Sequence, residues 1–170
     1  MAKRVAIFAD TLYQEMELWY PLYRLKEAGV DVKIVAFEAG KTYASKLGYP
    51  VVSDMSYTHA DAAAFDGVIV PGGFAPDYMR RHAGASAFVS AMNKAGKLVA
   101  AICHGPWMLC TADILRGRRA TAFMSIKTDV VNAGAIWEDA ETVVDNNIVT
   151  ARKPDDLPAF MRACLGVLGV

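Results

Sequence analysis

Apolar runs without polar interruption recur along the chain and alternate with segments in which apolar residues return every three or four positions. The runs predict strands that are buried on both faces, and the three-to-four spacing predicts amphipathic helices. The predicted strands cover residues 4–9, 30–37, 65–70, 98–102 and 119–123, and the predicted helices cover 15–28, 77–95, 125–133 and 157–168. This alternation predicts a mainly parallel sheet with helices on both of its faces.

The pattern is weaker between residues 38 and 64, where 50–53 is the clearest short β segment. Residues 142–150 predict a hairpin whose two-residue turn is formed by Asn146 and Asn147. The chain has 170 residues, of which 54% are hydrophobic, and this is enough for one core. We therefore expect residues 1–170 to form a single α/β domain.

Composition and charge indicate which kinds of partner to expect. Lys and Arg total 18, as do Asp and Glu, so we expect a small-molecule ligand and no nucleic-acid binding. No apolar run approaches the roughly 18–20 residues that span a bilayer, so we expect no membrane association. The three cysteines have no regular spacing and no cleavable leader precedes the first strand, so we expect a reduced, cytoplasmic protein. Metal-ligand spacings and glycine-rich phosphate motifs are absent, so we expect neither a metal nor a cofactor.

Cys103 stands where a buried strand, 98–102, turns into a helix that begins at Pro106. A thiol in such an elbow lies near the positive end of a helix, which favours the thiolate and makes Cys103 a candidate nucleophile. The alternative is that Cys103 is a small core residue, since free cysteines are often buried. That alternative suits Cys110 and Cys164 better, because both lie within apolar helical segments.

Three predicted loops leave the carboxyl ends of strands, where function gathers in parallel sheets. The first loop leads to Glu15 and Glu17, in the first turn of a helix, and a carboxyl group there can share a proton with Cys103. A Glu17→Gln change is then expected to raise or broaden the titration of the thiol. The second loop contains Gly72 and Gly73, whose amides can donate to an oxyanion. The alternatives are solvated glutamates that complement the helix dipole and a simple glycine turn.

His104 is adjacent to Cys103, but neighbours in an extended strand point in opposite directions. Their pairing therefore requires the elbow to twist the chain. His59 and His82 are predicted to lie on the surface. Since no histidine follows His104, the chain lacks the downstream base of papain-like enzymes and glutamine amidotransferases. Ala101 also replaces the first glycine of the amidotransferase elbow.

Four motifs stand at separate places along the chain: Glu17 four residues before Pro21, Pro71-Gly72-Gly73 with Ala75-Pro76-Asp77, Ala101-Ile102-Cys103-His104-Gly105-Pro106, and Asn132-Ala133-Gly134-Ala135 with Trp137. Together they resemble the DJ-1/PfpI superfamily, in its PfpI-like branch, over essentially the whole chain. The resemblance implies a flavodoxin-like α/β three-layer sandwich with a cysteine nucleophile elbow. It also implies that Cys103 is the nucleophile and that Glu17 is hydrogen-bonded to it.

The resemblance further implies a third acidic group, donated to His104 by a neighbouring subunit. The matching position here is Asp77, one methylene shorter than the glutamate of the branch, and we expect a homodimer or larger homo-oligomer. Phe123 stands where some relatives place a tyrosine hydroxyl over the pocket, so we expect Phe123 to line it together with Glu15. Gly72, Gly73 and Gly105 are the expected glycines of the oxyanion and binding region.

Our leading hypothesis is a stress-response enzyme in which Cys103 attacks a small reactive carbonyl or a glycated substrate, as a glyoxalase III or deglycase does. Glu17 and His104 then move protons. A second hypothesis is a cysteine peptidase or amidase that uses Cys103, His104 and Asp77 across a subunit interface. A third is a non-enzymatic redox sensor or chaperone in which Cys103 is oxidised to a sulfinate held by Glu17.

Overall fold

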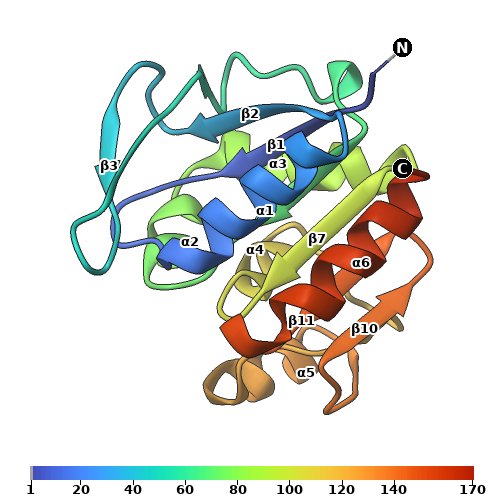
Figure 1. Ribbon diagram of the computed structural model, residues 1–170. Helices are drawn as coiled ribbons and strands as arrows, with labels where there is room; N and C mark the ends of the chain where they lie inside the picture. The colour runs from blue at the N-terminus through green and yellow to red at the C-terminus, as the bar shows by residue number, and fades with distance from the viewer. Residues whose placement is uncertain (1) are drawn as a thin grey trace.

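A seven-stranded sheet forms the centre of the computed structural model, which describes residues 2–170 (Figure 1). Its strand order is β10-β11-β7-β6-β1-β2-β5. The strands are β1 (Arg4–Phe8), β2 (Asp31–Ala36), β5 (Met55–Ser56), β6 (Gly67–Val70), β7 (Leu98–Ile102), β10 (Thr142–Asp145) and β11 (Ile148–Ala151). Every neighbouring pair is parallel except β10 with β11, which is antiparallel. The mainly parallel α/β sheet is therefore confirmed.

Helices cover both faces of the sheet, as the alternating pattern predicts. In Figure 1, α1 (Glu15–Glu27) and α6 (Leu157–Leu168) lie side by side on one face. The opposite face carries α3 (Ala83–Lys94) and α4 (Pro106–Thr111), which contact β7. The result is a three-layer sandwich.

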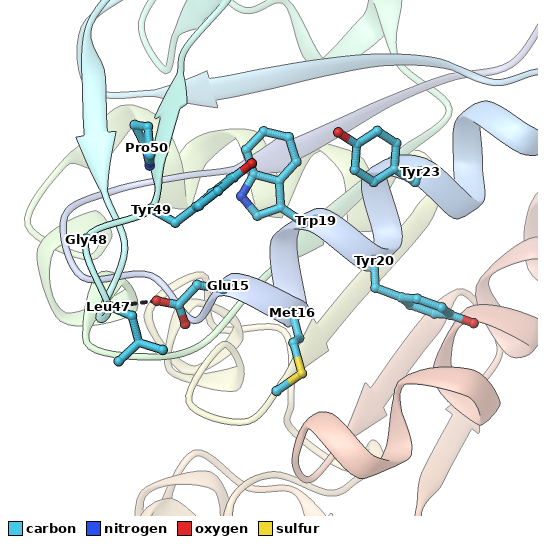
Figure 2. Close-up of a pocket in the computed structure, with 9 residues that line it drawn as sticks. All are labelled: Glu15, Met16, Trp19, Tyr20, Tyr23, Leu47, Gly48, Tyr49 and Pro50. Carbon is cyan, nitrogen blue, oxygen red and sulfur yellow. Dashed lines mark hydrogen bonds between the residues drawn. The ribbon is translucent and has the colours of Figure 1, made fainter.

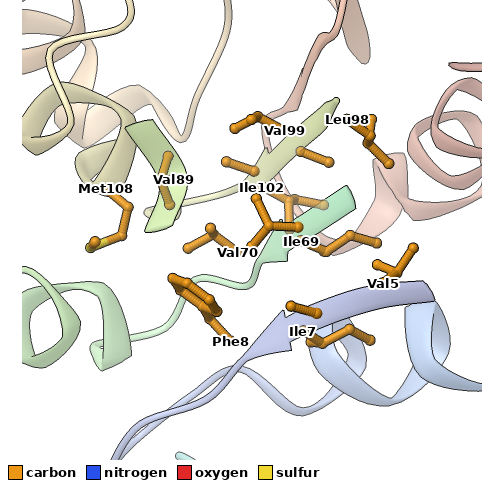
Figure 3. Packing of buried hydrophobic residues seen from close by; sticks show 14 of the residues in the cluster. Val5, Ile7, Phe8, Ile69, Val70, Val89, Leu98, Val99, Ile102 and Met108 are labelled. Carbon is orange, nitrogen blue, oxygen red and sulfur yellow. The ribbon is translucent and has the colours of Figure 1, made fainter. Parts of the chain in front are cut away.

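The central strands are wholly buried, which explains their uninterrupted apolar sequences (Figure 3). Phe8 of β1 packs on Phe88 of α3 with ring centroids 5.5 Å apart. Because side chains alternate along a strand, Ile7 points to the other face, toward the layer of α1 and α6. Each central strand thus contributes to two apolar interfaces, one on each face of the sheet. This is why the central strands are buried on both faces.

The predicted helix 77–95 is wrong as one continuous element. The chain forms α2 (Ala75–Met79) and then α3, because the backbone of His82 is extended, with φ −105° and ψ 111°. The His82 ring stacks on Phe37 with centroids 4.0 Å apart, a tertiary contact that helical periodicity does not reveal. The predicted helix 125–133 likewise begins with a 3-10 turn, η2 (Met124–Ile126), before α5 (Lys127–Asn132).

Smaller strands and turns complete the chain. The predicted strand 119–123 ends early as β8 (Arg119–Ala120), which pairs in parallel with β9 (Ile136–Trp137). The weakly patterned connection contains a second hairpin, β3 (Thr42–Ala44) with β4 (Pro50–Val52). The remaining 3-10 turns are η1 (Ala62–Ala64) and η3 (Pro154–Asp156). The hairpin around Asn146 and Asn147 is confirmed. Across residues 2–170, none of the helices is both long enough and apolar enough to cross a bilayer.

Three adjacent parallel strands, β6, β7 and β1, bring their carboxyl ends to one edge of the sheet. The segments that follow these strands contain the first turn of α1 with Glu17, the Gly72-Gly73 turn and the Cys103 elbow. The topology therefore places the candidate chemistry at one location.

Candidate active site

The elbow after β7 bends sharply at the cysteine itself. Cys103 has φ +62°, a left-handed conformation that is unfavourable for a residue with a Cβ. Gly105 makes the bend possible, because a Cβ at this position would lie 2.3 Å from the Val70 carbonyl oxygen and 2.8 Å from that of Ile102. The Gly105 amide donates to the Ile102 carbonyl at 2.8 Å and closes the turn. Gly105 therefore has a steric role that holds the thiol in place.

Glu17 is fully buried, although it lies in the first turn of α1. Its Oε2 accepts a hydrogen bond of 2.7 Å from the Gly72 amide, and its Oε1 has no partner of acceptable geometry within residues 2–170. Burial raises the pKa of Glu17 to about 7, while the Gly72 amide and the Cys103 thiol act in the opposite direction. The alternative of a solvated glutamate is wrong, because this carboxyl group is desolvated and titrates near neutral pH.

Gly72 lies between the three reactive groups. A Cβ there would lie 2.7 Å from the Cys103 Cβ, 2.7 Å from Glu17 Oε2 and 2.8 Å from the His104 amide nitrogen. No side chain fits at these distances. The glycine thus lets Glu17, Cys103 and His104 approach one another, which is more than the role of a simple turn.

The protonation of Cys103 differs from the expectation that the elbow favours the thiolate. Burial, together with the negative charge of Glu17, raises the pKa of Cys103 to about 12. The amides of Gly73 and His104 donate toward the sulfur and lower it, but α4 has only six residues and its N-terminus does not reverse the effect of burial. Since both groups are desolvated, Glu17 and Cys103 carry one negative charge between them more easily than two.

His104 does turn toward the thiol, as the left-handed bend requires. Its Nδ1 lies 3.3 Å from the Cys103 Sγ, and its Nε2 lies 3.1 Å from the Ser125 hydroxyl. The ring stacks on Phe123 at 5.1 Å and meets the edge of Trp107 at 5.2 Å. Burial, followed by the positive charge of Lys46, lowers the pKa of His104, so the imidazole is neutral at pH 7 and can accept a proton.

A cavity of about 300 Å³ opens over the thiol. It is lined by Gln14, Glu17, Lys46, Gly73, Phe74, Cys103, His104, Phe123 and Pro154. Phe123 lies where we expect it, but Gln14, Lys46, Phe74 and Pro154 do not follow from our sequence reasoning. Gln14 and Phe74 lie in the same strand-end segments as Glu17 and Gly73, so applying the strand-end rule to every residue of these segments finds both. Lys46 enters through the β3–β4 hairpin, whose position depends on tertiary contacts.

Glu15 lies outside this cavity, so its expected place in the pocket is wrong. Its Oε1 accepts from the Leu47 amide at 2.6 Å and from the Ser45 hydroxyl, which ties α1 to the β3–β4 loop. Figure 2 shows Glu15 at one end of a separate aromatic groove beside Trp19 and Tyr49. Glu15 therefore supports the loop rather than the thiol.

Asp77 lies on α2 with half of its side chain exposed, and it forms an ion pair with Arg81 of the same chain. The expected role of this carboxylate across a subunit interface stays a prediction. The other two thiols differ from Cys103: Cys164 is buried, and Cys110 is partly exposed with a pKa that burial raises to about 11. Among the described residues, no cluster of three His, Cys, Asp or Glu side chains is arranged to hold a metal ion.

The chain is similar to known proteins over nearly its whole length. Residues 3–166 match the model of the DJ-1/PfpI family. A deglycase of Thermococcus kodakarensis is 43% identical over 165 residues, which are 97% of this chain and 99% of that protein. The putative cysteine protease YraA of Bacillus subtilis is 41% identical over 168 residues, 99% of each chain. A two-domain protein of Anabaena variabilis, with a DJ-1/ThiJ/PfpI-like and a ferritin-like domain, matches with a TM-score of 0.96 and 42% identity over 98% of this chain and 48% of its own. The chain belongs to the DJ-1/PfpI family.

Proposed function

We propose that the protein is an enzyme that acts on small reactive carbonyls or on their adducts with amines, with Cys103 as the nucleophile. The observation that carries the proposal is the buried pair of Glu17 and Cys103 in a cavity of about 300 Å³. A cavity of this size suits a compact ligand. The deglycase name of a relative with 43% identity supports the same substrate class.

The first chemical step follows from the contacts of the thiol. The Cys103 sulfur forms a bond to the carbonyl carbon, the thiol proton passes to His104 Nδ1 at 3.3 Å, and the carbonyl π pair moves to oxygen. The amides of Gly73 and His104, which donate toward the sulfur, face the developing oxyanion. The protonated imidazole then returns the proton to that oxygen, which gives a hemithioacetal.

Glu17 moves the next proton in the case of a 2-oxoaldehyde. It takes the proton from the carbon bound to sulfur and returns it to the neighbouring carbon, while the hydroxyl proton of the hemithioacetal passes to the former ketone oxygen. The hemithioacetal and the ketone thereby become a thioester and an alcohol. Water then cleaves the carbon–sulfur bond and frees the thiol. The sum is the addition of one water molecule to give a 2-hydroxy acid. A carboxyl group with a pKa of about 7 suits both halves of this transfer.

Turnover of methylglyoxal to lactate tests the proposal directly. Cys103→Ser is expected to abolish lactate formation, while Cys110→Ser, which alters a partly exposed thiol outside the cavity, keeps it. Lactate formation by Cys103→Ser at the rate of the unchanged protein contradicts the proposal. We also propose that the protein works in the reducing cytoplasm, since the three cysteines of residues 2–170 are free thiols. The name of general stress protein 18 of Bacillus subtilis, which is 39% identical over 170 residues, supports a role in a stress response.

A peptidase or amidase is the second candidate. The contact between Cys103 and His104 and the putative protease name of a relative with 41% identity favour it. It requires Asp77 of a neighbouring chain to leave Arg81 and reach His104. Release of amines from acyl-peptide substrates, lost in Asp77→Ala, is the result that distinguishes this activity from carbonyl turnover.

A further inference from the structure

Ser125 lies two residues beyond Phe123, in a segment that is fixed to the cysteine elbow. The Phe123 amide donates to the Cys103 carbonyl at 2.9 Å, and the Ile126 amide donates back to the Phe123 carbonyl at 3.0 Å. The Ile126 side chain is buried in the core. The backbone on both sides of Ser125 is therefore held, and the position of its hydroxyl relative to the elbow is defined by the fold.

The His104 ring is held on four sides by this arrangement. Phe123 covers one face, the Trp107 ring meets it at 67°, Cys103 lies at Nδ1 and the Ser125 hydroxyl lies at Nε2. The two ring nitrogens thus have different partners. Only a ring orientation with Nδ1 on the sulfur side allows the thiol proton to move to the imidazole.

We propose that Ser125 is a positioning residue that keeps His104 in the tautomer with its proton on Nε2, leaving Nδ1 free to accept the proton of Cys103. The inference rests on the proposed function, in which His104 takes that proton. The protonated thiol donates to Nδ1 in this proposal, so the neutral ring carries its proton on Nε2. That N–H group donates to the Ser125 oxygen, which lies 3.1 Å away, and it continues to donate after Nδ1 is protonated. One hydroxyl therefore serves both states of the base.

The Ser125 hydroxyl is neutral, whereas a carboxylate in its place carries a negative charge. The charged or titratable groups around the ring are Cys103 at the elbow, Lys46 from the β3–β4 loop and Glu17 across the cavity. Burial and Lys46 lower the pKa of His104, and Ser125 leaves that pKa low because it is neutral. A carboxylate at Nε2 raises the pKa of an imidazole by favouring its charged form. Ser125 thus orients His104 within one chain without making it cationic at neutral pH.

Three variants test the role of the hydroxyl. Ser125→Ala removes it, and Ser125→Thr restores it. Ser86→Ala is the matched control, because the Ser86 hydroxyl donates to the Ala83 carbonyl at the exposed start of α3 and lies outside the cavity. Turnover of methylglyoxal, the ¹⁵N chemical shifts of the three histidines and the pH dependence of Cys103 alkylation by iodoacetamide are measured for each. Variants of His59 and His82 assign the signals.

Ser125→Ala is expected to lower kcat about 3- to 10-fold, the range of one neutral hydrogen bond, with KM changed less than about two-fold. Its His104 signals shift toward a mixture of tautomers, and Ser125→Thr returns both kcat and the signals toward the starting values. Ser86→Ala changes neither. A Ser125→Ala protein with unchanged His104 ¹⁵N shifts and unchanged alkylation profile overturns the inference.

The ¹⁵N chemical shifts and the pH dependence of alkylation do not depend on turnover, so they separate this inference from the proposed function. If Cys103→Ser still forms lactate, the proposed function is wrong, whereas the tautomer and alkylation data of Ser125→Ala still decide whether Ser125 positions His104. If Cys103→Ser is inactive but Ser125→Ala behaves as the unchanged protein in all three measurements, the proposed function stands and the positioning role fails.

Discussion

The buried carboxyl group of Glu17 accepts a 2.7 Å hydrogen bond from the amide of Gly72, a glycine whose missing side chain leaves room for Cys103. The backbone amide of Gly72 therefore holds the Glu17 carboxylate, and the lack of a side chain at Gly72 leaves room for the Cys103 thiol. Both members of the buried pair, Glu17 and Cys103, therefore depend on the same glycine.

Gly72→Ala is expected to disturb both groups at once. The added Cβ meets the Cys103 Cβ, Glu17 Oε2 and the His104 nitrogen at 2.7–2.8 Å, and all three are held by packing or backbone. Overpacking of this kind costs about 1–3 kcal/mol. We expect a loss of that size in the free energy of unfolding, measured by chemical denaturation, and a loss of at least about tenfold in turnover.

Gly166→Ala is the matched control for that substitution. Gly166 lies in α6, and a Cβ there meets no heavy atom within 4 Å. Alanine is a better helix former than glycine by up to about 1 kcal/mol. Gly166→Ala is therefore expected to raise stability slightly without affecting turnover. Equal losses in the two variants are incompatible with a specific role for Gly72.

The burial of Glu17 makes the stability of the protein depend on pH. Its pKa is about 7 in the folded chain, above the usual value of 4.5, so the folded state favours the protonated form. This contribution to stability is fully present below about pH 4.5 and is lost as the pH rises through about 7. Glu17→Gln, which stays neutral, is expected to remove a decrease of about 3 kcal/mol between these values. Chemical denaturation of both proteins at several pH values in this range measures the effect. If the free energy of unfolding depends on pH in the same way in both proteins, the prediction is wrong.

The same substitution tests the charge shared with the thiol. Because the Glu17 carboxylate raises the pKa of Cys103, Glu17→Gln is expected to lower that pKa and to speed alkylation above pH 7. The sequence-based expectation was that this change raises or broadens the titration of the thiol. The structure favours the opposite direction, because the charge of the buried Glu17 carboxylate raises the pKa of Cys103. Turnover still falls in Glu17→Gln, because the amide moves no proton. The pH dependence of iodoacetamide alkylation, followed at Cys103 by mass spectrometry, gives the answer.

Uninterrupted apolar runs made the sheet predictable from the sequence. Strands such as β6 and β7 are buried on both faces, so nearly every residue in them is apolar. The break between α2 and α3 was not predictable in the same way. It depends on His82 stacking on Phe37, which are distant in sequence, and a helical pattern continues through it.

Some residues of the candidate site were predictable from the sequence, and others were not. Cys103, Glu17 and Gly72 follow from the rule that loops at the carboxyl ends of parallel strands converge. Ser125 does not follow from it, because its segment reaches the elbow through the hydrogen bond of Phe123 to Cys103. The misplacement of Glu15 has a similar cause: Glu17 turns inward while Glu15, two residues earlier on α1, faces the β3–β4 loop.

Cys103 is expected to be alkylated before the other two thiols near neutral pH, in spite of its burial. Its Sγ lies 3.3 Å from His104 Nδ1, which accepts the proton as the sulfur reacts, whereas Cys110 is near the carbonyl of Asp129, which accepts no proton. Limited treatment with iodoacetamide followed by peptide mapping measures the order. First labelling of Cys110 or Cys164 shows that the elbow does not activate its thiol.

Mixing the inactive Cys103→Ser protein with the weakened Asp77→Ala protein tests whether a second chain completes the site. If Asp77 of a neighbour orients His104, Cys103→Ser and Asp77→Ala proteins combine into oligomers in which some sites contain both an intact thiol and an intact carboxylate. Part of the activity then returns on mixing. Ser125 gives His104 a partner within the chain, so the expected loss in Asp77→Ala alone is partial and becomes larger in the double variant Asp77→Ala/Ser125→Ala. Normal turnover by Asp77→Ala, or full activity of a strictly monomeric form, excludes the role across the interface and leaves Glu17 as the only carboxylate of the site.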